Sequence, residues 1–454
     1  MMRKNVFVVA LVLLVALVSC AEHECVWKEV SVTEPTCASE GERVLKCNGC
    51  GATRTEKIAK LPHELADDGW KFNDVDFVYE QKCKSCNEMQ YKEIESGVRI
   101  QGIAGFENRL FETANEAYAV INEFLKNNGG LGQESLKSTD FDNIFTDIDE
   151  NGDAKVVWTI YGEQRMIEDS EHPYFLSFGR KAAHYGDGRH FSRVAVVGGN
   201  ASAKLIRSTL SFSYDWWDGC PNRGDVAFKN ISMGAVENSN GQYLVNMSQA
   251  YTWGVTMSYE NCSIKGFLYC YVNNSYALNV KNCTFDSILG KEYSIHVQGS
   301  ATAPAAISIE GCTFKNSRGV NIDQATAEAR IVGNTFVNCG NLTDNEDNNY
   351  YGVIQVTKGA NVLVDGNTIE NCKGNAIWVW SSKGVGAFTG KLTFKDNLIK
   401  DCSYAFAEYG NEYTLESSGN TISGTNVDKC FARVMEDGNV VYVYKEIDAE
   451  TKLQ

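Results

Sequence analysis

Two Cys-x-x-Cys pairs are the residues whose types and spacing point most directly to chemistry. The first pair is Cys47 and Cys50, and the second is Cys83 and Cys86. In both copies an isoleucine follows the first cysteine by eleven residues, so the pairs lie in the same local pattern. Two such pairs on facing hairpins would put four thiolates at the corners of a tetrahedron, the geometry of structural Zn²⁺ sites. The spacing predicts one zinc site made of all four cysteines.

This stretch resembles a zinc ribbon, although the 32 residues between the two pairs exceed the usual gap. The segment 33–63 also resembles short Cys-rich modules in surface proteins of anaerobic bacteria. That resemblance implies a different ligand set: Cys37, Cys47, Cys50 and His63. Disulfides are a third interpretation, with Cys25 and Cys37 as a candidate pair, because an exported chain permits them. The expected role of the module is stability or docking, since no open coordination position for catalysis can be argued.

A repeated pattern between Met257 and Ile422 organises most of the remaining chain. Each copy has a Cys or Asn anchor, with a large apolar residue two places later and, in most copies, others three and five places earlier. The anchors are residues 262, 283, 312, 334, 367, 397 and 420, with a fainter eighth copy anchored at residue 230. Alternation at period two predicts strands, and a second alternation within most copies predicts two short strands per repeat. Irregular units of 21 to 33 residues with this pattern are typical of one coil of a solenoid.

Stacked coils would turn the anchors into a column, in which an Asn donates to the coil on one side and accepts from the coil on the other. The repeat resembles the right-handed parallel β-helix of the pectin-lyase-like superfamily, over about residues 155–435. The expected fold class is all-β: a right-handed parallel β-helix solenoid with an N-terminal helical cap and a small Cys-rich module. The expected parts are a signal peptide (1–21), a zinc-ribbon-like module (22–96), a helical cap (97–155), the β-helix (156–440) and a C-terminal tail (441–454).

Two sets of cysteines recur along the repeat and would stack in the interior. Their Cβ vectors run parallel at about the 4.8 Å spacing of neighbouring strands, longer than the roughly 3.8 Å of a relaxed disulfide. We therefore expect free buried thiols. The two sets are Cys262, Cys283 and Cys312, and Cys339, Cys372 and Cys402.

The second strand of each repeat offers a candidate ligand face, because residues between its inward-pointing apolar positions should point outward. Amides, one histidine, one acid and aromatic residues in register suit a sugar chain, whose rings stack on aromatic faces and whose hydroxyls bond amides. Solenoid strands also carry such residues for cross-strand pairing alone, which is the alternative interpretation. The predicted outward residues are Tyr271, Asn273, His296, Gln298, Asn321, Asp323, Gln355, Trp378 and Trp380.

Two classes of function fit this face. The enzyme class is a polysaccharide lyase or glycoside hydrolase acting on an acidic polysaccharide, for which His296 and Asp323 are the candidate catalytic residues. A lyase of the resembled superfamily needs Ca²⁺ carboxylates and an Arg or Lys base, for which Arg318 and Arg330 are nearest, and a hydrolase needs a carboxylate pair. The other class, which the sparse acid and base content favours, is a non-catalytic surface module for adhesion or glycan binding.

The segment before the repeat should cap the solenoid and carries a calcium-like motif. Apolar residues at helical spacing predict a helix over 112–126. Residues 147–153, Asp-Ile-Asp-Glu-Asn-Gly-Asp, match the first half of an EF-hand loop, but position twelve is Trp158 instead of Glu. An Asn-Gly turn leading into a strand explains the same residues. Calcium binding and a simple turn are therefore both interpretations of this segment.

The N-terminus predicts export. Arg3 and Lys4 precede an apolar run over 6–18 that is too short to span a bilayer. The residues Leu17 to Cys20 resemble a bacterial lipobox, which implies lipidation of Cys20 and a membrane-anchored surface protein, whereas cleavage after Ala21 would release it. The net charge of −16 makes nucleic acid an unsuitable partner. The expected partner is a polysaccharide or cell-surface glycan, with membrane contact through the lipid anchor alone.

Overall fold

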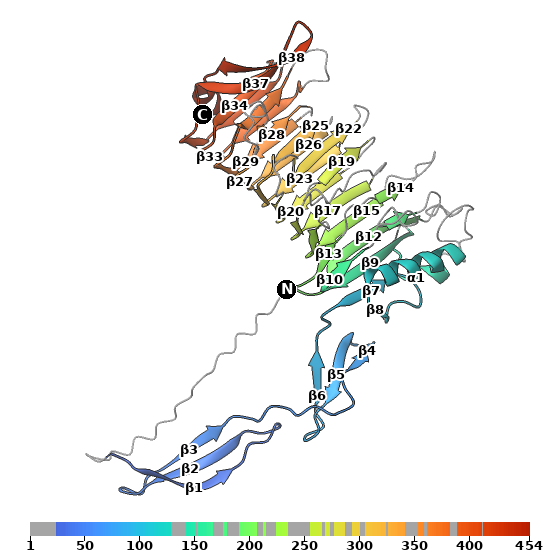
Figure 1. Ribbon diagram of the computed structural model, residues 1–454, viewed down its shortest axis with the longest axis vertical. Coiled ribbons are helices and arrows are strands. Elements are labelled where there is room, and N and C mark those ends of the chain that lie inside the picture. Colours follow the sequence, from blue (N-terminus) through green and yellow to red (C-terminus); the bar gives the residue numbers. More distant parts are fainter. Residues whose placement is uncertain are drawn as a thin grey trace. The chain divides into compact units, whose positions relative to one another are not determined.

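The computed structural model describes two compact units, which divide between Glu93 and Ile94 (Figure 1). The residues that it describes are 24–128, 142–150, 152–166, 176–178, 190–206, 212–214, 224–234, 255–265, 268–272, 277–286, 293–299, 305–323, 326–340, 352–357, 361–381, 388–410 and 412–454. The predicted signal peptide and Cys20 lie outside these residues. No helix of the described part has the length and apolar character needed to cross a bilayer.

The N-terminal unit consists of two small antiparallel sheets. The first has the order β1-β2-β3, from Trp27–Thr33, Gly41–Cys47 and Thr53–Ile58, and the second the order β4-β5-β6, from Lys71–Asn73, Val78–Lys82 and Met89–Lys92. Its buried hydrophobic side chains in the described part are Cys37, Leu45, Cys47, Phe77 and Cys83. Since three of these five are cysteines, hydrophobic burial alone gives this unit little stability. Small domains with so few buried apolar side chains commonly rely on a cross-link or a metal ion.

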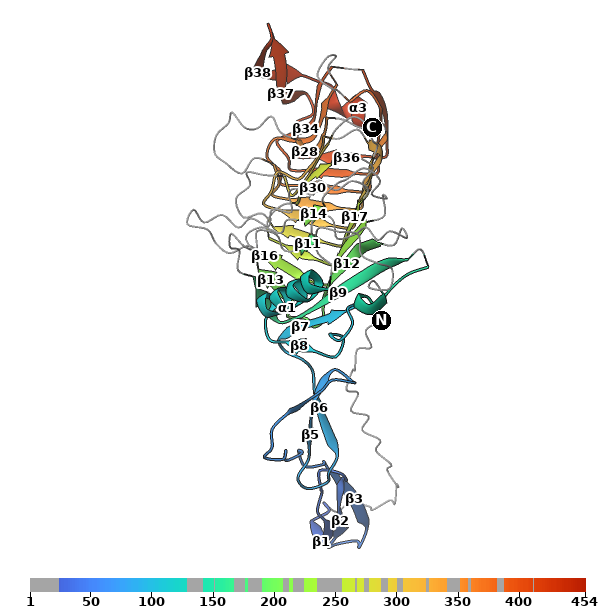
Figure 2. The same cartoon turned by 90° about the vertical axis from the view of Figure 1, so that its right-hand side faces the viewer.

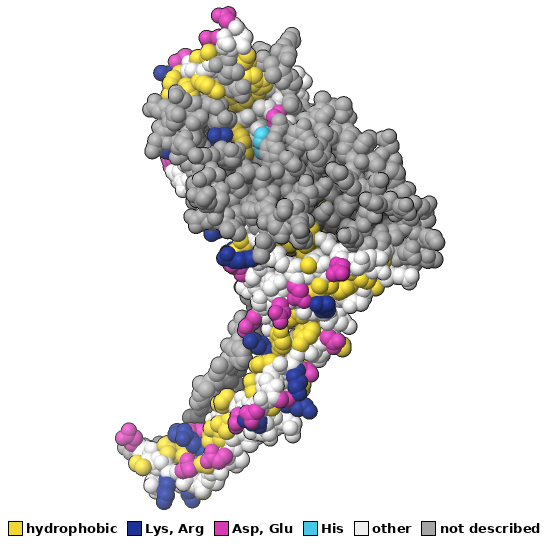
Figure 3. Space-filling view, turned by 45° about the vertical axis from the view of Figure 1, so that its right-hand side comes forward, with side chains coloured by type: hydrophobic (Ala, Val, Ile, Leu, Met, Phe, Trp, Pro, Cys, Tyr) yellow, Lys and Arg dark blue, Asp and Glu magenta, His cyan; other side chains and the backbone are white. Residues whose placement is uncertain are grey.

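The surface of the N-terminal unit mixes both signs of charge. Figure 3 shows Lys and Arg side chains interspersed with Asp and Glu along it. Several form exposed ion pairs, such as Arg43 with Glu56 at 2.6 Å and Lys57 with Glu40 at 2.8 Å. Exposed pairs of this kind contribute about 0–1 kcal/mol each, so they do not replace a core.

The second unit is a parallel β-helix with three sheets (Figures 1 and 2). Sheet one contains β7 (Gly97–Gln101), β8 (Leu110–Phe111), β9 (Asp153–Tyr161), β12 (His190–Gly198), β15 (Gly224–Lys229), β17 (Val255–Glu260), β20 (Ala277–Lys281), β23 (Ala305–Glu310), β26 (Thr326–Val332), β29 (Asn361–Asp365), β32 (Lys391–Lys395) and β35 (Thr414–Ser418). Sheet two contains β10 (Glu163–Arg165), β13 (Lys204–Ile206), β16 (Ser232–Gly234), β18 (Ser263–Ile264), β21 (Thr284–Asp286), β24 (Thr313–Lys315), β27 (Thr335–Val337), β30 (Thr368–Glu370), β33 (Leu398–Lys400) and β36 (Thr421–Ser423).

Sheet three contains β19 (Leu268–Val272), β22 (Ile295–Gly299), β25 (Val320–Asp323), β28 (Gly352–Val356), β31 (Asn375–Trp380) and β34 (Tyr404–Tyr409). A further pair, β11 (Leu176–Phe178) and β14 (Phe212–Tyr214), is also parallel. A complete coil therefore contributes one strand to each of three sheets, for example β20, β21 and β22. The prediction of two strands per repeat was wrong, because the anchor motif straddles a corner and its Thr-Phe or Thr-Ile end forms a short strand of its own.

The corner explains why Asn, Gly or Asp precedes each anchor from Cys262 onward. Asn261, Asn282, Gly333 and Asp396 have φ of 54°, 53°, 63° and 54°. This left-handed region is strained for most residues and is tolerated best by Gly, Asn and Asp. The residue before the anchor therefore turns the chain from sheet one into sheet two. The Asn-x-Ser/Thr triplets of the repeat fall at this turn.

The predicted column of anchors is confirmed from Cys262 onward. The anchor predicted at Asn230 was wrong by one residue, because Asn230 has a φ of 54° and lies at the turn, and Ile231 takes the anchor position. Asn334 donates from Nδ2 to Oδ1 of Asn367 at 3.0 Å, and Asn367 donates from Nδ2 to Oδ1 of Asn397 at 2.9 Å. Asn397 continues the series to Asn420 at 3.0 Å. The first three are each 1% exposed, so the ladder satisfies buried amides from coil to coil.

The interior of the coils is apolar and in register. Phe285, Phe314 and Phe336 stack with ring centroids 5.0 Å and 4.7 Å apart. The six ladder cysteines named from the sequence are free and buried, as predicted. Cys312, in the anchor column, accepts from the backbone N–H of Cys283 through Sγ at 3.4 Å. A thiol thus takes the place of the Asn side chain in these coils.

Both ends of the solenoid are covered. Helix α1 (Ala114–Asn127) lies close to the predicted 112–126, and Thr113 caps it by accepting from the N–H of Glu116 at 3.1 Å. At the other end the antiparallel hairpin of β37 (Lys429–Glu436) and β38 (Asn439–Glu446) is followed by α3 (Ala449–Leu453). Ala449 and Leu453 are fully buried. Residues 441–454, expected to be a tail, are therefore part of the end cap, which closes the exposed core and strand edges of the last coil.

Candidate functional site

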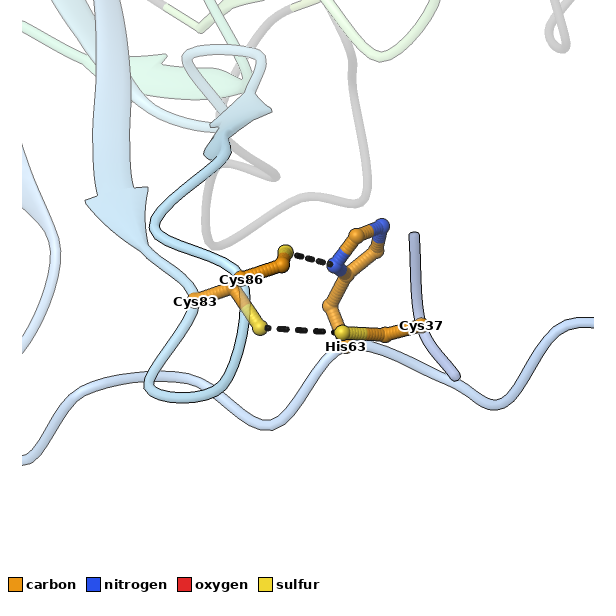
Figure 4. A group of neighbouring side chains, drawn as sticks. All are labelled: Cys37, His63, Cys83 and Cys86. Carbon is orange, nitrogen blue, oxygen red and sulfur yellow. Dashed lines mark hydrogen bonds between the residues drawn. The ribbon is translucent and has the colours of Figure 1, made fainter. Parts of the chain in front are cut away.

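A Cys₃His cluster in the N-terminal unit has the composition of a metal site (Figure 4). It consists of Cys37 between β1 and β2, His63 after β3, Cys83 just after β5, and Cys86 in the turn to β6. Sγ of Cys37 lies 3.6 Å from Sγ of Cys83, and Sγ of Cys86 lies 3.4 Å from Nδ1 of His63. All four donor atoms lie within 4.8 Å of one another. Four soft donors from four points of the chain can hold a structural metal ion.

Backbone geometry favours a thiolate in this cluster. Burial disfavours the charged form of Cys83, but hydrogen bonds from the backbone N–H groups of Cys86 and Ser85 and from His63 outweigh it and lower the pKa of the Cys83 thiol to about 6. Hydrogen bonding with Cys86, then burial, raises the pKa of Cys37 to about 11. The turn that contains Cys83 and Cys86 therefore offers one thiolate, that of Cys83, to a metal ion. Binding of the ion would have to displace the proton of Cys37.

A second cluster contains three cysteines. Cys25 precedes β1, Cys47 ends β2, and Cys50 lies in the turn to β3. Sγ of Cys25 lies 3.8 Å from Sγ of Cys50, and all three sulfur atoms lie within 4.8 Å of one another. Hydrogen bonding with Cys47, then burial, raises the pKa of Cys25 to about 12. This cluster also has the composition and spacing to hold a metal ion.

The two Cys-x-x-Cys pairs therefore do not share one site, and the predicted pairing was wrong. Each pair lies where two strands of its own sheet are joined, β2 to β3 for the first pair and β5 to β6 for the second. Its partners come from elsewhere: Cys25 for the first pair, and Cys37 with His63 for the second. The alternative set that combined Cys37 and His63 with Cys47 and Cys50 is divided in the same way. The candidate disulfide between Cys25 and Cys37 does not form, because the two sulfur atoms belong to different clusters.

A sequence signal for the missed ligands existed in the spacing ahead of each pair. Cys25 precedes Cys47 by 22 residues and His63 precedes Cys83 by 20. A Cys or His at that distance is a candidate ligand for the pair that follows it. Cys37 carries no such signal, because it lies 46 residues ahead of Cys83.

The outward residues of sheet three form columns as predicted. His296 pairs with Asn321, Asn321 with Gln355, and Gln355 with Trp378 on successive strands. One coil earlier, the residue opposite His296 is Tyr269 and the residue opposite Gln298 is Tyr271. The prediction placed Tyr271 and Asn273 at these two positions, so it was wrong by two residues in this coil. Tyr271, Gln298 and Asp323 form a neighbouring column. Asn273 and the side chains of Tyr271 and Gln298 lie outside the described residues.

The two tryptophans do point away from the coil interior, but they are not exposed. Trp378 is 3% and Trp380 8% exposed, and both belong to a separate hydrophobic cluster with Ala432 and Val434 of β37. The C-terminal hairpin covers this end of sheet three. The predicted stacking of a sugar on these two rings is therefore wrong, because the hairpin already occupies their faces.

Replacing Ala432 with Asp tests this cover. Ala432 is fully buried beside the tryptophans, and an unpaired carboxylate there costs several kcal/mol. We expect the hairpin to detach, with tryptophan fluorescence more strongly quenched by acrylamide and a lower midpoint of thermal unfolding. Asn439→Asp adds the same charge at an exposed position of the same hairpin and should change neither reading. Equal quenching in both variants would contradict the cover.

The polar part of the outward face lies around His296, away from the hairpin. Burial lowers the pKa of His296, and the Asp323 carboxylate opposes that shift. Tyr293 packs edge-on against the His296 ring with centroids 5.9 Å apart, and its hydroxyl donates to Oε1 of Gln355. Asn321 is 5% exposed, and its Oδ1 has no hydrogen-bond partner among the residues that the structure describes. This cluster combines a neutral imidazole, amides and a phenol in three successive coils.

In the EF-hand-like segment, an ion pair engages a carboxylate that a calcium ion would need as a ligand. Oδ2 of Asp149 accepts from Nη1 of Arg193 at 2.8 Å. Trp158, at the twelfth position, is 3% exposed within the solenoid core and provides no ligand oxygen. Asn151 lies outside the described residues. Calcium binding here stays a hypothesis.

The coils stack so that each complete coil adds one parallel strand to each of three sheets, and a helix and a hairpin cover the two ends. This arrangement defines the class: the protein is a right-handed parallel β-helix protein. Residues 269–445 match the family model described as the right handed beta helix region. No curated protein matches the sequence. A solved structure, ORF18 of Geobacillus virus E2, aligns with 80% of this chain and 70% of that chain, at 11% identity and a TM-score of 0.27. A likeness at that TM-score supports no conclusion about this chain.

Proposed function

We propose that this protein is an exported, non-catalytic glycan-binding protein, with a ligand face around His296, Asn321 and Gln355 of sheet three and a structural zinc ion in the N-terminal unit. The single observation that carries the binding role is the register of these three residues. They lie opposite one another on β22, β25 and β28, so each coil adds one polar side chain at the strand spacing of about 4.8 Å. A chain of sugar units can meet such a ladder repeatedly.

The chemistry of the face supports a polyhydroxylated ligand. Oδ1 of Asn321 is a buried acceptor without a hydrogen-bond partner in the described part of the chain, and leaving such a group unpaired costs about 1–3 kcal/mol. A water molecule or a ligand hydroxyl that enters beside Asn321 would be a suitable donor for it. The net charge of −16 disfavours an anionic chain on general electrostatic grounds. A neutral glycan therefore fits better than a uronic-acid polymer.

The structural role of zinc is supported by the Cys₃His donor set. Zinc in structural sites takes four Cys or His ligands in tetrahedral geometry, and four such donor atoms lie within 4.8 Å of one another here. With Leu45 and Phe77 as the buried non-cysteine hydrophobics of the described N-terminal unit, the ion would supply much of its folding free energy.

Display at the cell surface is supported by the sequence alone. The apolar leader and the lipobox-like residues before Cys20 favour export and lipid attachment, which would leave the N-terminal unit next to the membrane as a stalk. Cleavage after Ala21 would instead give a secreted form. Mass spectrometry of the processed N-terminus separates the two: a diacylated Cys20 supports the anchor, and an unmodified Glu22 overturns it.

A second candidate function is favoured by His296 itself. Because burial lowers its pKa, the imidazole is neutral at neutral pH and could act as a general base beside Asp323, as a lyase or hydrolase of acidic polysaccharides requires. A hydrolase would need a second carboxylate across the bond, and Asp323 is the acid that the neighbouring column of Tyr271 and Gln298 provides. New reducing ends or unsaturated products from uronic-acid polysaccharides, lost in His296→Ala and Asp323→Ala, would replace the binding role with this one.

Calorimetry and a glycan array test the binding role directly. We expect Gln355→Ala and His296→Ala each to weaken binding of a neutral glycan at least about tenfold, which corresponds to about 1.4 kcal/mol. Thr393→Ala is the matched control, because Thr393 is a half-buried outward residue of β32 in sheet one. It should leave the affinity within about twofold. Absence of binding to every glycan tested, or equal losses in all three variants, would overturn the proposal.

A further inference from the structure

The two Cys-x-x-Cys turns are closed by the same backbone hydrogen bonds. In the first turn, the N–H of Cys47 donates to the carbonyl of Ala52 at 2.8 Å, and the N–H of Gly51 donates to the carbonyl of Cys47 at 3.0 Å. In the second turn, the same two bonds around Cys83 measure 2.9 Å and 3.1 Å. The residue four places after the first cysteine has a left-handed backbone in both, with a φ of 75° at Gly51 and 61° at Asn87.

The first turn is also paired with the segment that follows Cys25. The N–H of Asn48 donates to the carbonyl of Val26 at 3.0 Å. Cys47 lies opposite Trp27 in the antiparallel register of β1 and β2. The residues one and two places after Cys25 therefore both contact the turn.

The second turn is paired in the same way with the segment that follows His63. The N–H of Lys84 donates to the carbonyl of Glu64 at 2.8 Å. Cys83 lies opposite Leu65 in an antiparallel bridge. Here too, the residues one and two places after His63 contact the turn.

Cys25 and His63 therefore occupy equivalent positions beside their turns. Nδ1 of His63 lies 3.4 Å from Sγ of Cys86, the second cysteine of its pair, and Sγ of Cys25 lies 3.8 Å from Sγ of Cys50, the second cysteine of the other pair. The sulfur atoms of Cys25, Cys47 and Cys50 all lie within 4.8 Å of one another. The first turn thus repeats the arrangement that brings three of the four donors of the Cys₃His cluster together.

We propose that Cys25, Cys47 and Cys50 bind a second Zn²⁺ ion, which fastens the beginning of β1 to the turn between β2 and β3. Thiolate sulfur is a preferred zinc ligand in structural sites. Strand β1 is at the edge of its sheet and pairs with β2 alone, so an ion held by the residue before this strand and by the turn would prevent β1 from fraying. The expected stoichiometry does not depend on which group completes the coordination of the ion.

The ion in the Cys₃His cluster would have a different role. Cys37 lies between β1 and β2 and His63 follows β3, so both belong to the first sheet, whereas Cys83 and Cys86 lie between β5 and β6 of the second. That ion would join the two sheets, and the ion proposed at Cys25 would act within the first sheet. Loss of the latter should therefore loosen β1 and leave the joint between the sheets intact.

Native mass spectrometry and thiol alkylation of the full chain test the second site. We expect two zinc ions per chain in the unaltered protein and one in Cys25→Ser/Cys50→Ser. Asn48→Ala is the matched control and should keep both ions, because the Asn48 side chain is exposed and its backbone N–H is retained. Cys50 is exposed, so iodoacetamide should label it rapidly after chelation and slowly in the zinc-loaded protein.

Hydrogen exchange tests the role of the ion and shows whether the variant still folds. In Cys25→Ser/Cys50→Ser, the amides of β1 should exchange faster than in the unaltered protein, and those of β4, β5 and β6 should keep their rates. Unchanged exchange in β1 would overturn the fastening role. Two ions in this double variant would place the second ion elsewhere in the chain and overturn the site itself.

The second site shares with the proposed function the premise that zinc binds this unit, and the remaining outcomes keep the two apart. One ion in the unaltered protein, with Cys50 labelled at the same rate before and after chelation, overturns the second site and leaves the Cys₃His site standing. One ion with a disulfide between Cys25 and Cys50, seen as a mass lower by the two thiol hydrogens, does the same. The absence of any ion overturns both sites.

Discussion

Removal of the proposed zinc by a strong chelator should unfold residues 24–93 and leave residues 94–454 folded. The described N-terminal unit buries Leu45 and Phe77 beside its cysteines, whereas zinc binding in small domains supplies about 10–16 kcal/mol at neutral pH. The β-helix has its own continuous core and contains neither metal cluster. Limited trypsin digestion with mass spectrometry measures the result: cleavage should spread through the lysines and arginines of the first unit and stop near Ile94.

The controls separate the metal from other effects of the chelator. Added Zn²⁺ should restore resistance, and Ca²⁺ should not, since thiolates and imidazole are poor calcium ligands. Cys86→Ser should be sensitive without chelator. The neighbouring Ser85→Ala should behave like the unaltered protein, because the Ser85 side chain is exposed and its backbone N–H is kept. A digestion pattern that chelation leaves unchanged would show that the unit folds without metal.

How much of this protein can be predicted depends on whether the relevant contacts are periodic. The anchor column follows from local spacing, because each coil repeats the same left-handed turn and the same Asn or Cys. Asn334, Asn367 and Asn397 are therefore placed correctly by counting along the sequence. The burial of the cysteines in the coil interior can be predicted for the same reason.

The metal clusters resist this reasoning because their ligands are not periodic. A Cys-x-x-Cys pair is recognisable by itself, but it can be completed by any Cys or His that a loop brings near. Cys37 reaches Cys83 across 46 residues and another sheet. The simplest interpretation of the sequence combines the two Cys-x-x-Cys pairs in one metal site. The structure excludes it, because the two pairs belong to separate sheets and separate clusters.

The outward face shows a second limit. Strand alternation predicts which way Trp378 and Trp380 point, and the direction was right. It does not predict what lies over them, because the covering strand β37 comes about 50 residues later and continues no repeat. An aromatic pair on a solenoid face is therefore equally compatible with a ligand site and with a cap, and here the cap is present.

Replacement of Asn367 by Ala should be the most damaging single change in the β-helix. Its Oδ1 accepts from N and Nδ2 of Asn334 at 2.9 Å and 3.0 Å, and its Nδ2 donates to the carbonyl of Ile331 at 2.8 Å and to Oδ1 of Asn397 at 2.9 Å. Asn334, Asn367 and Asn397 are each 1% exposed, so the groups left without partners are cut off from water. At about 1–3 kcal/mol for each unsatisfied group, we expect a loss of about 4 kcal/mol or more in the free energy of unfolding, measured by urea denaturation followed by circular dichroism.

Asn367→Cys is the informative companion, because the chain itself uses Cys in this column. At Cys312 the sulfur accepts from the N–H of Cys283 at 3.4 Å and donates to the carbonyl of Glu310 at 3.4 Å. A thiol at position 367 can make the same two weaker bonds, so Asn367→Cys should lose about half as much stability as Asn367→Ala. The exposed Asn439→Ala should stay within about 0.5 kcal/mol of the unaltered protein. If Cys and Ala at position 367 proved equally harmful, hydrogen bonding along the column would not be what the anchor contributes, and its size and shape would have to explain the repeat instead.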